Sequence, residues 1–124
     1  MRKENVKIIF LLVLTLAACG KPLPKLEKMD MEAWKADRQG CRHDREKMIA
    51  PLSEQKDKLK GLSENDITRL LGRPDQNELW KRHQKFFYYF LSPAAACDPA
   101  NTNPKKLSIR FNAMERAKDV EIEN

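Results

Sequence analysis

The residues of this 124-residue chain that could do chemistry are three cysteines, two histidines and its many carboxylates. His43 and His83 stand about 40 residues apart, and no HExxH or CxxC spacing accompanies them, so no metal ligand set is complete. The four glycines form no phosphate-binding loop, and no serine lies in a nucleophile-elbow context. Carboxylate pairs such as Asp37 and Asp44 occur, yet sequence separation alone does not define an acid and a base. We therefore expect no metal, no cofactor and no enzymatic activity.

Cys19 follows a stretch with the order of a secretory signal, in which positive charge (Arg2, Lys3 and Lys7) precedes an apolar run and then small residues. The apolar run covers residues 8–18, apart from Thr15. As a helix, these residues would measure about 16 Å, against the roughly 30 Å of a bilayer's hydrocarbon core. We therefore expect residues 1–18 to be a removed signal peptide and not a transmembrane helix.

Residues 16–20, Leu-Ala-Ala-Cys-Gly, resemble the lipobox of bacterial lipoproteins. The resemblance implies that Cys19 becomes the first mature residue, with a diacylglycerol on its thiol and a further acyl chain such as palmitate on its amino group. In this family an aspartate after the cysteine favours retention in the inner membrane, so Gly20 points to the outer membrane, with the leaflet left open. The alternative is an ordinary cleaved signal with a cysteine nearby.

If Cys19 is lipidated, Cys41 and Cys97 remain as an even pair in an oxidising compartment, where a disulfide is the usual outcome. Closing a loop of about 57 residues would stabilise the fold by about 4 kcal/mol in the chain-entropy model. The alternative is a reactive thiol beside His43, but no other residue completes such an arrangement. We therefore predict the Cys41–Cys97 disulfide.

The mature chain carries a smaller net positive charge than the whole chain. Loss of the signal peptide removes three positive charges and one negative charge, so the formal net charge of +6 falls to +4. Outside the cytoplasm, a mild positive balance suits an anionic membrane surface or an acidic partner better than nucleic acid. We expect no nucleic-acid partner.

The mature chain divides into a tether and one small domain. Residues 19–28 contain Pro22 and Pro24 among lysines, which favours an extended linker whose lysines lie near lipid headgroups or simply in solvent. Residues 29–124 are enough for one domain with a thin core.

The first part of the domain has helical patterns. Residues 29–40 predict a short helix that starts at Asp30 and stops at Gly40, and residues 41–59 predict a longer helix divided near Pro51. Residues 63–72 predict a helix capped by Ser63 and ended by Gly72.

The remainder has strand patterns. Residues 77–82 and 85–92 form a candidate antiparallel pair, and the aromatic run in the second of them predicts a central strand with both faces covered. Residues 107–112 and 119–123 alternate apolar and polar side chains, with a turn between them. The expected fold is therefore α+β, with N-terminal helices packed on a four-stranded antiparallel meander.

Residues 61–74 (Gly-Leu-Ser…Leu-Leu-Gly-Arg-Pro) and the strands that follow them resemble small outer-membrane lipoproteins of the SmpA/OmlA type. In that family a short helix ends in a Leu-Gly-x-Pro turn before an antiparallel sheet, and β-lactamase-inhibitor-like modules are similar in fold. The best-known members are accessory subunits of the β-barrel assembly machinery. The segment before residue 60 and the cysteine pair depart from this pattern.

The candidate interaction surface is the basic stretch Trp80, Lys81, Arg82, His83 and Lys85. It could be a hairpin loop that contacts an acidic partner or lipid headgroups, or a solvated turn with Trp80 tucked inward. The expected function is that of a lipid-anchored, non-catalytic envelope lipoprotein that binds other envelope proteins. The alternatives are an inhibitor or immunity-like module for an exported enzyme and, as a third class, an envelope enzyme.

Overall fold

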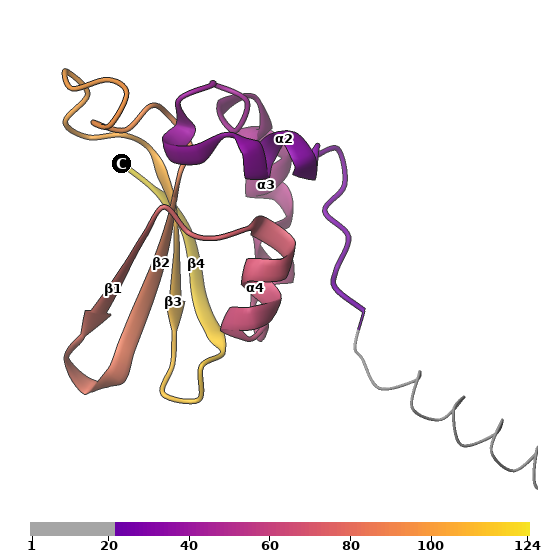
Figure 1. Cartoon of the computed structure of the whole chain (residues 1–124). Coiled ribbons are helices and arrows are strands. Elements are labelled where there is room, and N and C mark those ends of the chain that lie inside the picture. Colours follow the sequence, from indigo (N-terminus) through magenta and orange to yellow (C-terminus); the bar gives the residue numbers. More distant parts are fainter. Residues whose placement is uncertain (1–21) are drawn as a thin grey trace, which may run out of the picture.

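The protein consists of a layer of helices on one side of an antiparallel sheet (Figure 1). The computed structural model describes residues 22–124. The predicted signal peptide, Cys19 and the first part of the tether lie outside the described residues.

The sheet is an antiparallel meander of four strands in the order β1-β2-β3-β4. The strands are β1 (Gln76–Trp80), β2 (Gln84–Phe90), β3 (Lys106–Phe111) and β4 (Ala117–Glu123). In the register, Phe87 lies opposite Ile109, which in turn lies opposite Val120. The α+β class and the four-stranded meander predicted from the sequence are therefore confirmed.

Alternation along the strands sends half of the sheet's side chains into the core beneath the helices. Tyr89, Ile109, Phe111 and Val120 have no exposed surface there. Side chains on both faces of β2 are buried as predicted, since Phe87, Tyr88, Tyr89 and Phe90 are each at most 6% exposed. The helices, however, cover one side of the sheet only (Figure 1). The other side is called the open face below.

Helix α2 (Met31–Ala36) starts as predicted, because the carboxylate of Asp30 accepts the backbone N–H of Ala33 at 3.2 Å. It ends four residues before Gly40. The buried carboxylate of Asp37 accepts the backbone N–H groups of Arg42 and Arg45 at 2.6 and 2.9 Å, and this turns the chain away from the helix axis. A 3-10 turn η1 (Arg38–Gly40) follows.

The predicted helix over residues 41–59 is broken into three pieces: the 3-10 turn η2 (Glu46–Met48), helix α3 (Ile49–Gln55) and the 3-10 turn η3 (Lys56–Leu59). Pro51 lies in the first turn of α3, where its missing N–H has no partner to lose. The break therefore precedes Pro51 and falls at Met48, which leaves the helical region with φ −100° and ψ 4°.

Helix α4 (Glu64–Leu71) agrees with its sequence signals. The hydroxyl of Ser63 accepts the backbone N–H of Asp66 at 3.1 Å, and Ile67 and Leu71 enter the core. Gly72 ends the helix at φ +82°, a conformation that suits glycine.

Part of the predicted tether belongs to the packed domain. Leu26 is 5% exposed within the core cluster, and the backbone N–H of Glu27 donates to the side chain of Gln55 at 2.8 Å. Contacts with the domain therefore include Leu26 and do not begin only after residue 28, because an apolar side chain was available to bury.

Candidate functional site

The predicted basic stretch forms the tip of the β1–β2 hairpin. Trp80 ends β1, and the 3-10 turn η4 (Lys81–His83) links it to β2. Trp80 is 57% exposed, so the alternative in which it tucks inward is wrong. The indole packs edge-on against Phe86 with ring centroids 5.9 Å apart, and its Nε1 donates to Glu78 at 2.9 Å.

Lys85 does not join this surface. Its Nζ lies 2.8 Å from a carboxylate oxygen of Glu64, at the start of α4. Alternation along β2 explains the separation, because neighbouring side chains of a strand point to opposite sides of the sheet. The candidate interaction surface therefore consists of Trp80, Lys81, Arg82 and His83.

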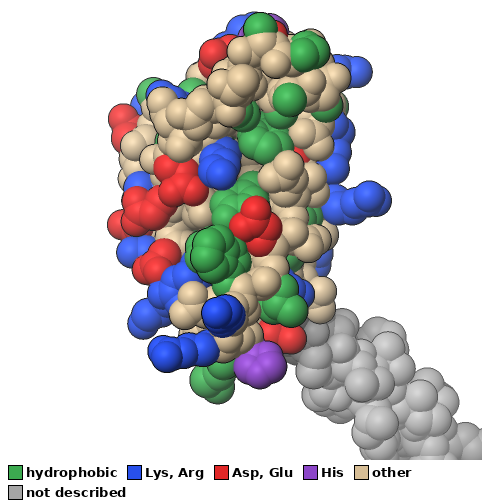
Figure 2. Space-filling model, turned by 90° about the vertical axis from the view of Figure 1, so that its left-hand side faces the viewer, with side chains coloured by type: hydrophobic (Ala, Val, Ile, Leu, Met, Phe, Trp, Pro, Cys, Tyr) green, Lys and Arg blue, Asp and Glu red, His purple; other side chains and the backbone are tan. Residues whose placement is uncertain are grey.

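An aromatic stripe runs along the open face. Trp80 contacts Phe86, and Phe86 stacks on Tyr88 with centroids 6.0 Å apart and an interplanar angle of 13°. The ammonium group of Lys106 lies 4.3 Å from the Tyr88 ring centroid, a cation–π contact. Figure 2 shows this stripe as green side chains down the middle of the face. No helix of the described chain covers it (Figure 1).

Charged side chains border the stripe. Asp119, Glu121 and Glu123 alternate along β4 and line a groove of about 360 Å³ together with Phe86, Ser108 and Arg110. Arg110 donates from Nε to Asp119 at 2.6 Å, whereas Glu123 is exposed at the groove's rim. Glu121 lies 3.9 Å from Nζ of Lys56, so among these three carboxylates only Glu123 forms no ion pair with a described residue. The open face therefore presents the partly exposed ring of Phe86 beside charged side chains, whereas Tyr88 is only 6% exposed. Aromatic side chains are enriched in protein interfaces.

The two tyrosines stay neutral at physiological pH. Burial, with Glu78 and Glu123 nearby, raises the pKa of Tyr88 to about 12. Burial also raises the pKa of Tyr89, whose hydroxyl donates to the carbonyl of Gly72 at 2.7 Å. The hydroxyl of Tyr88 therefore serves as a donor, and it points to Glu78 at 3.2 Å.

At the other end of the sheet, Cys41 and Cys97 form the predicted disulfide, with Cα atoms 5.8 Å apart. The bond ties the turn after α2 to the long loop between β2 and β3. The backbone N–H of Ala94 in this loop also donates to the carbonyl of Gln39 at 3.0 Å. Because both sulfur atoms are in this bond, neither Cys41 nor Cys97 carries a reactive thiol.

A buried ion pair lies beside the disulfide and was not predicted. The side chains of Arg45 and Asp75 are both fully buried, and their Nη1 and Oδ2 atoms are 2.6 Å apart. Arg45 also donates to the carbonyls of Trp34 and Phe90, and its guanidinium lies 4.9 Å from the Trp34 ring centroid. Asp75 stands about 30 residues from Arg45, so no local spacing could indicate the pair.

The two histidines lie apart. The Nδ1 of His43 is 2.9 Å from Glu46 near the disulfide, and His83 lies on the hairpin tip. His83 borders a hollow of about 280 Å³ with Glu64 and Lys85, which are paired with each other. Within residues 22–124, no group of three or more metal-ligating side chains occurs.

Comparison of the chain with protein-family models, with curated proteins and with solved structures finds no match. No helix in the described part of the chain is long and apolar enough to cross a membrane. What the fold and the site define is a two-layer α+β domain with an open, aromatic sheet face.

Proposed function

We propose that the protein is a lipid-anchored, non-catalytic lipoprotein of the bacterial cell envelope that binds another envelope protein through the open face. The observation that carries the binding role is the groove of about 360 Å³ on the open face, where the ring of Phe86 lies beside the carboxylates of β4 and which no helix of the described chain covers. Aromatic side chains are enriched in protein interfaces and supply much of their binding energy.

The anchor rests on the sequence. The order of charge, apolar run and small residues before Cys19 is that of an export signal, and the residues around it resemble a lipobox. The disulfide is consistent with export, because such bonds persist in oxidising compartments. Gly20 favours the outer membrane.

The anchor and the binding face are tested separately. For the anchor, Cys19→Ala should release the protein from membrane fractions. A membrane-bound Cys19→Ala protein, or a wild-type protein without added lipid mass, contradicts it.

For the binding face, a photoreactive amino acid placed at Glu123, on the rim of the groove, should give a specific cross-linked partner in intact cells. The matched control position is Glu32, an exposed carboxylate on α2 at the helical side. Adducts at Glu32 alone, or at neither position, contradict binding through the open face. Phe86→Ala should abolish the Glu123 adduct.

The acidic row on β4 favours one alternative, an inhibitor or immunity-like module that covers a basic rim of an exported enzyme. The cross-linked partner separates the two roles. A partner that fractionates with membranes supports an assembly module, whereas a soluble enzyme that loses activity in a one-to-one complex supports an inhibitor.

A further inference from the structure

Three large apolar side chains remain exposed in the described chain, and all lie at one end of the sheet. Leu79 is 72% exposed, Trp80 57% and Met114 81%. Leu79 and Trp80 lie on the β1–β2 hairpin, and Met114 lies in the β3–β4 turn. The two tips are neighbours, because both line the hollow beside His83. Residues 79–83 and 112–118 are called the hairpin end here.

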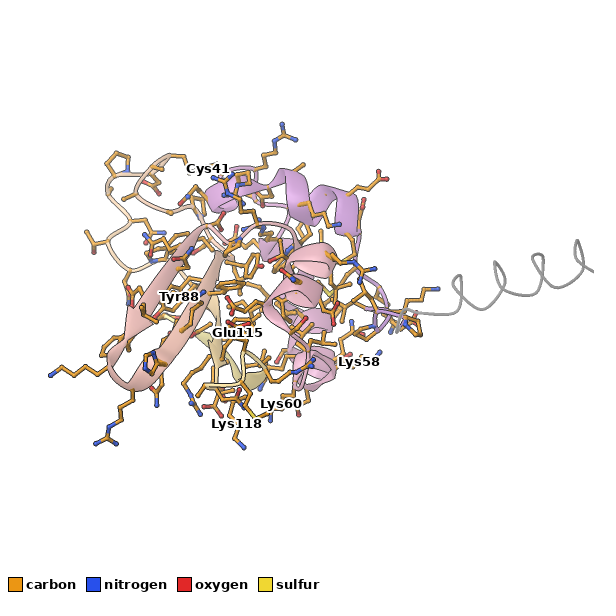
Figure 3. All side chains as sticks on the ribbon, turned by 60° about the horizontal axis from the view of Figure 1, so that its bottom comes forward. Cys41, Lys58, Lys60, Tyr88, Glu115 and Lys118 are labelled. Carbon is orange, nitrogen blue, oxygen red and sulfur yellow. A yellow bond between two sulfur atoms is a disulfide. The ribbon has the colours of Figure 1, made fainter. Side chains whose placement is uncertain are left out.

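The hairpin end is also basic. It carries Lys81, Arg82, Arg116 and Lys118, all exposed, against Glu115 and the paired Asp119 beside it. None of these four cations forms an ion pair with a residue in the range 22–124. Figure 2 shows blue side chains gathered at the lower end of the aromatic stripe. Figure 3 places Lys60 and Lys118 at this end and Cys41 at the opposite one.

We propose that the hairpin end rests on the surface of an anionic lipid bilayer, with Trp80, Leu79 and Met114 in the headgroup region. Indole rings favour this region because one edge is apolar and the other donates a hydrogen bond. Lysine and arginine near anionic lipid add about 1 kcal/mol of attraction each. The inference extends the proposed anchor, since it states which end of the domain faces the lipid.

The attachment of the N-terminal segment favours the same orientation. Cys19 is only six residues before Lys25, which is about 20 Å of extended chain. The carbonyl of Lys25 accepts from Nζ of Lys58 at 3.1 Å, in the turn η3, and Leu26 is buried. Two residues after η3, the N–H of Gly61 donates to the carbonyl of Ala117 at 2.8 Å, at the start of β4. The anchored segment therefore joins the domain near the hairpin end.

The distribution of the apolar groups favours lipid over an acidic protein. Leu79 and Trp80 are consecutive in β1, so their side chains point to opposite sides of a narrow two-stranded tip. A protein surface would cover one side of such a tip, whereas a fluid interface surrounds both sides. A lipid surface therefore buries more of the exposed apolar area.

The test uses the full chain, processed in bacteria and reconstituted in vesicles whose acyl chains carry bromine, which quenches nearby tryptophan fluorescence. Vesicles of mixed phosphatidylglycerol and phosphatidylcholine are compared with phosphatidylcholine alone. The protein has two tryptophans, and Trp34 is fully buried in the core, so it provides an internal reference. We expect strong quenching in the anionic vesicles, and Trp80→Phe should remove it.

The variant K81E/K118E should bind anionic vesicles about tenfold or more weakly, because each reversal replaces an attraction by a repulsion. The control R42E/K47E reverses two exposed charges away from the hairpin end and should bind as the wild type does. Met114→Ser, in the turn, should weaken quenching without any change of charge.

Equal quenching in the two kinds of vesicle, or no quenching in either, overturns the inference. The hairpin end would then be a binding surface for an acidic protein. The mass of the purified protein is measured first. If it carries no lipid, the proposed anchor fails, and the same protein mixed with preformed vesicles still tests the hairpin end.

Discussion

The two ends of the sheet are built in opposite ways. At one end, the disulfide, the buried Arg45–Asp75 pair and a close backbone approach fix the chain from α2 to the loop after β2. At the hairpin end, three large apolar side chains are exposed, and four exposed cations form no ion pair with a described residue. Polar groups at the disulfide end therefore bind one another within the molecule, whereas the exposed groups at the hairpin end remain available to a partner. The contrast indicates a rigid support that presents a contact surface, and five predictions test it.

The largest effect is expected from Arg45→Ala. It leaves the carboxylate of Asp75 buried without its charged partner, and breaking a buried pair in this way costs about 3–5 kcal/mol. The free energy of unfolding from denaturant titration measures it. Arg38→Ala is the control, because Arg38 lies 3.6 Å from Asp75 but is 43% exposed, and should cost less than about 1 kcal/mol. Equal losses of unfolding free energy in the two variants would show that the buried pair stabilises the fold no more than the exposed contact does.

Removal of the disulfide comes next. The double variant C41S/C97S should lose about 2–4 kcal/mol, because the unfolded chain regains the freedom of its closed loop. The same titration, with and without reductant, measures the loss. Reduction should destabilise the wild type and leave the double variant unchanged. Free thiols at both positions in the native protein would contradict the bond.

Glycine substitutions compare the two ends directly. Gly40 has φ +68°, and a Cβ there would stand 2.6 Å from the carbonyl oxygen of Ser92. Gly61, near the hairpin end, has φ +85° with nothing within 4 Å of such an atom. We expect Gly61→Ala to cost about 1 kcal/mol from its backbone conformation and Gly40→Ala at least about 2 kcal/mol, because it adds a clash with fixed backbone. Thermal unfolding ranks them, and similar midpoints would contradict a fixed end.

The fourth prediction concerns the pH dependence of stability that arises from Tyr88, in the middle of the sheet. The pKa of Tyr88 is raised to about 12, so the unfolded chain releases this proton near pH 10 while the folded protein keeps it. Stability from this group is therefore complete below pH 10 and is lost as the pH rises towards 12. Ultraviolet titration of the folded protein should show no tyrosine ionising at pH 10. Glu78→Gln should lower the pKa of Tyr88, and an unchanged titration would show that Glu78 has no part in the shift.

The smallest effect on stability is expected at the hairpin end. K81E/K118E should change the free energy of unfolding by less than about 0.5 kcal/mol, since exposed charges without partners hold nothing in place. The variant therefore separates folding from binding to lipid. A loss comparable with that of Arg45→Ala would show that the hairpin end is structural.

Elements with local signals were predictable from the sequence. Ser63 and Gly72 delimit α4 because a cap and a left-handed glycine act within a few residues. The strands followed from alternation, and the disulfide from a count of cysteines joined to a lipobox resemblance. The helix over residues 41–59 was predicted to divide near Pro51, but it breaks at Met48 and again at Gln55, because its apolar spacing is also compatible with short helical pieces.

The sequence by itself determined the order of helices and strands and the limits of α4, because caps and alternation act on the neighbouring backbone. Only the tertiary structure decided that Arg45 and Asp75 meet in the core, that Lys85 turns from Trp80 towards Glu64, and that Leu79, Trp80 and Met114 share one end. These relations depend on strand register and on which side of the sheet the helices cover. Both are set by packing between residues far apart in the chain, and no local pattern records them.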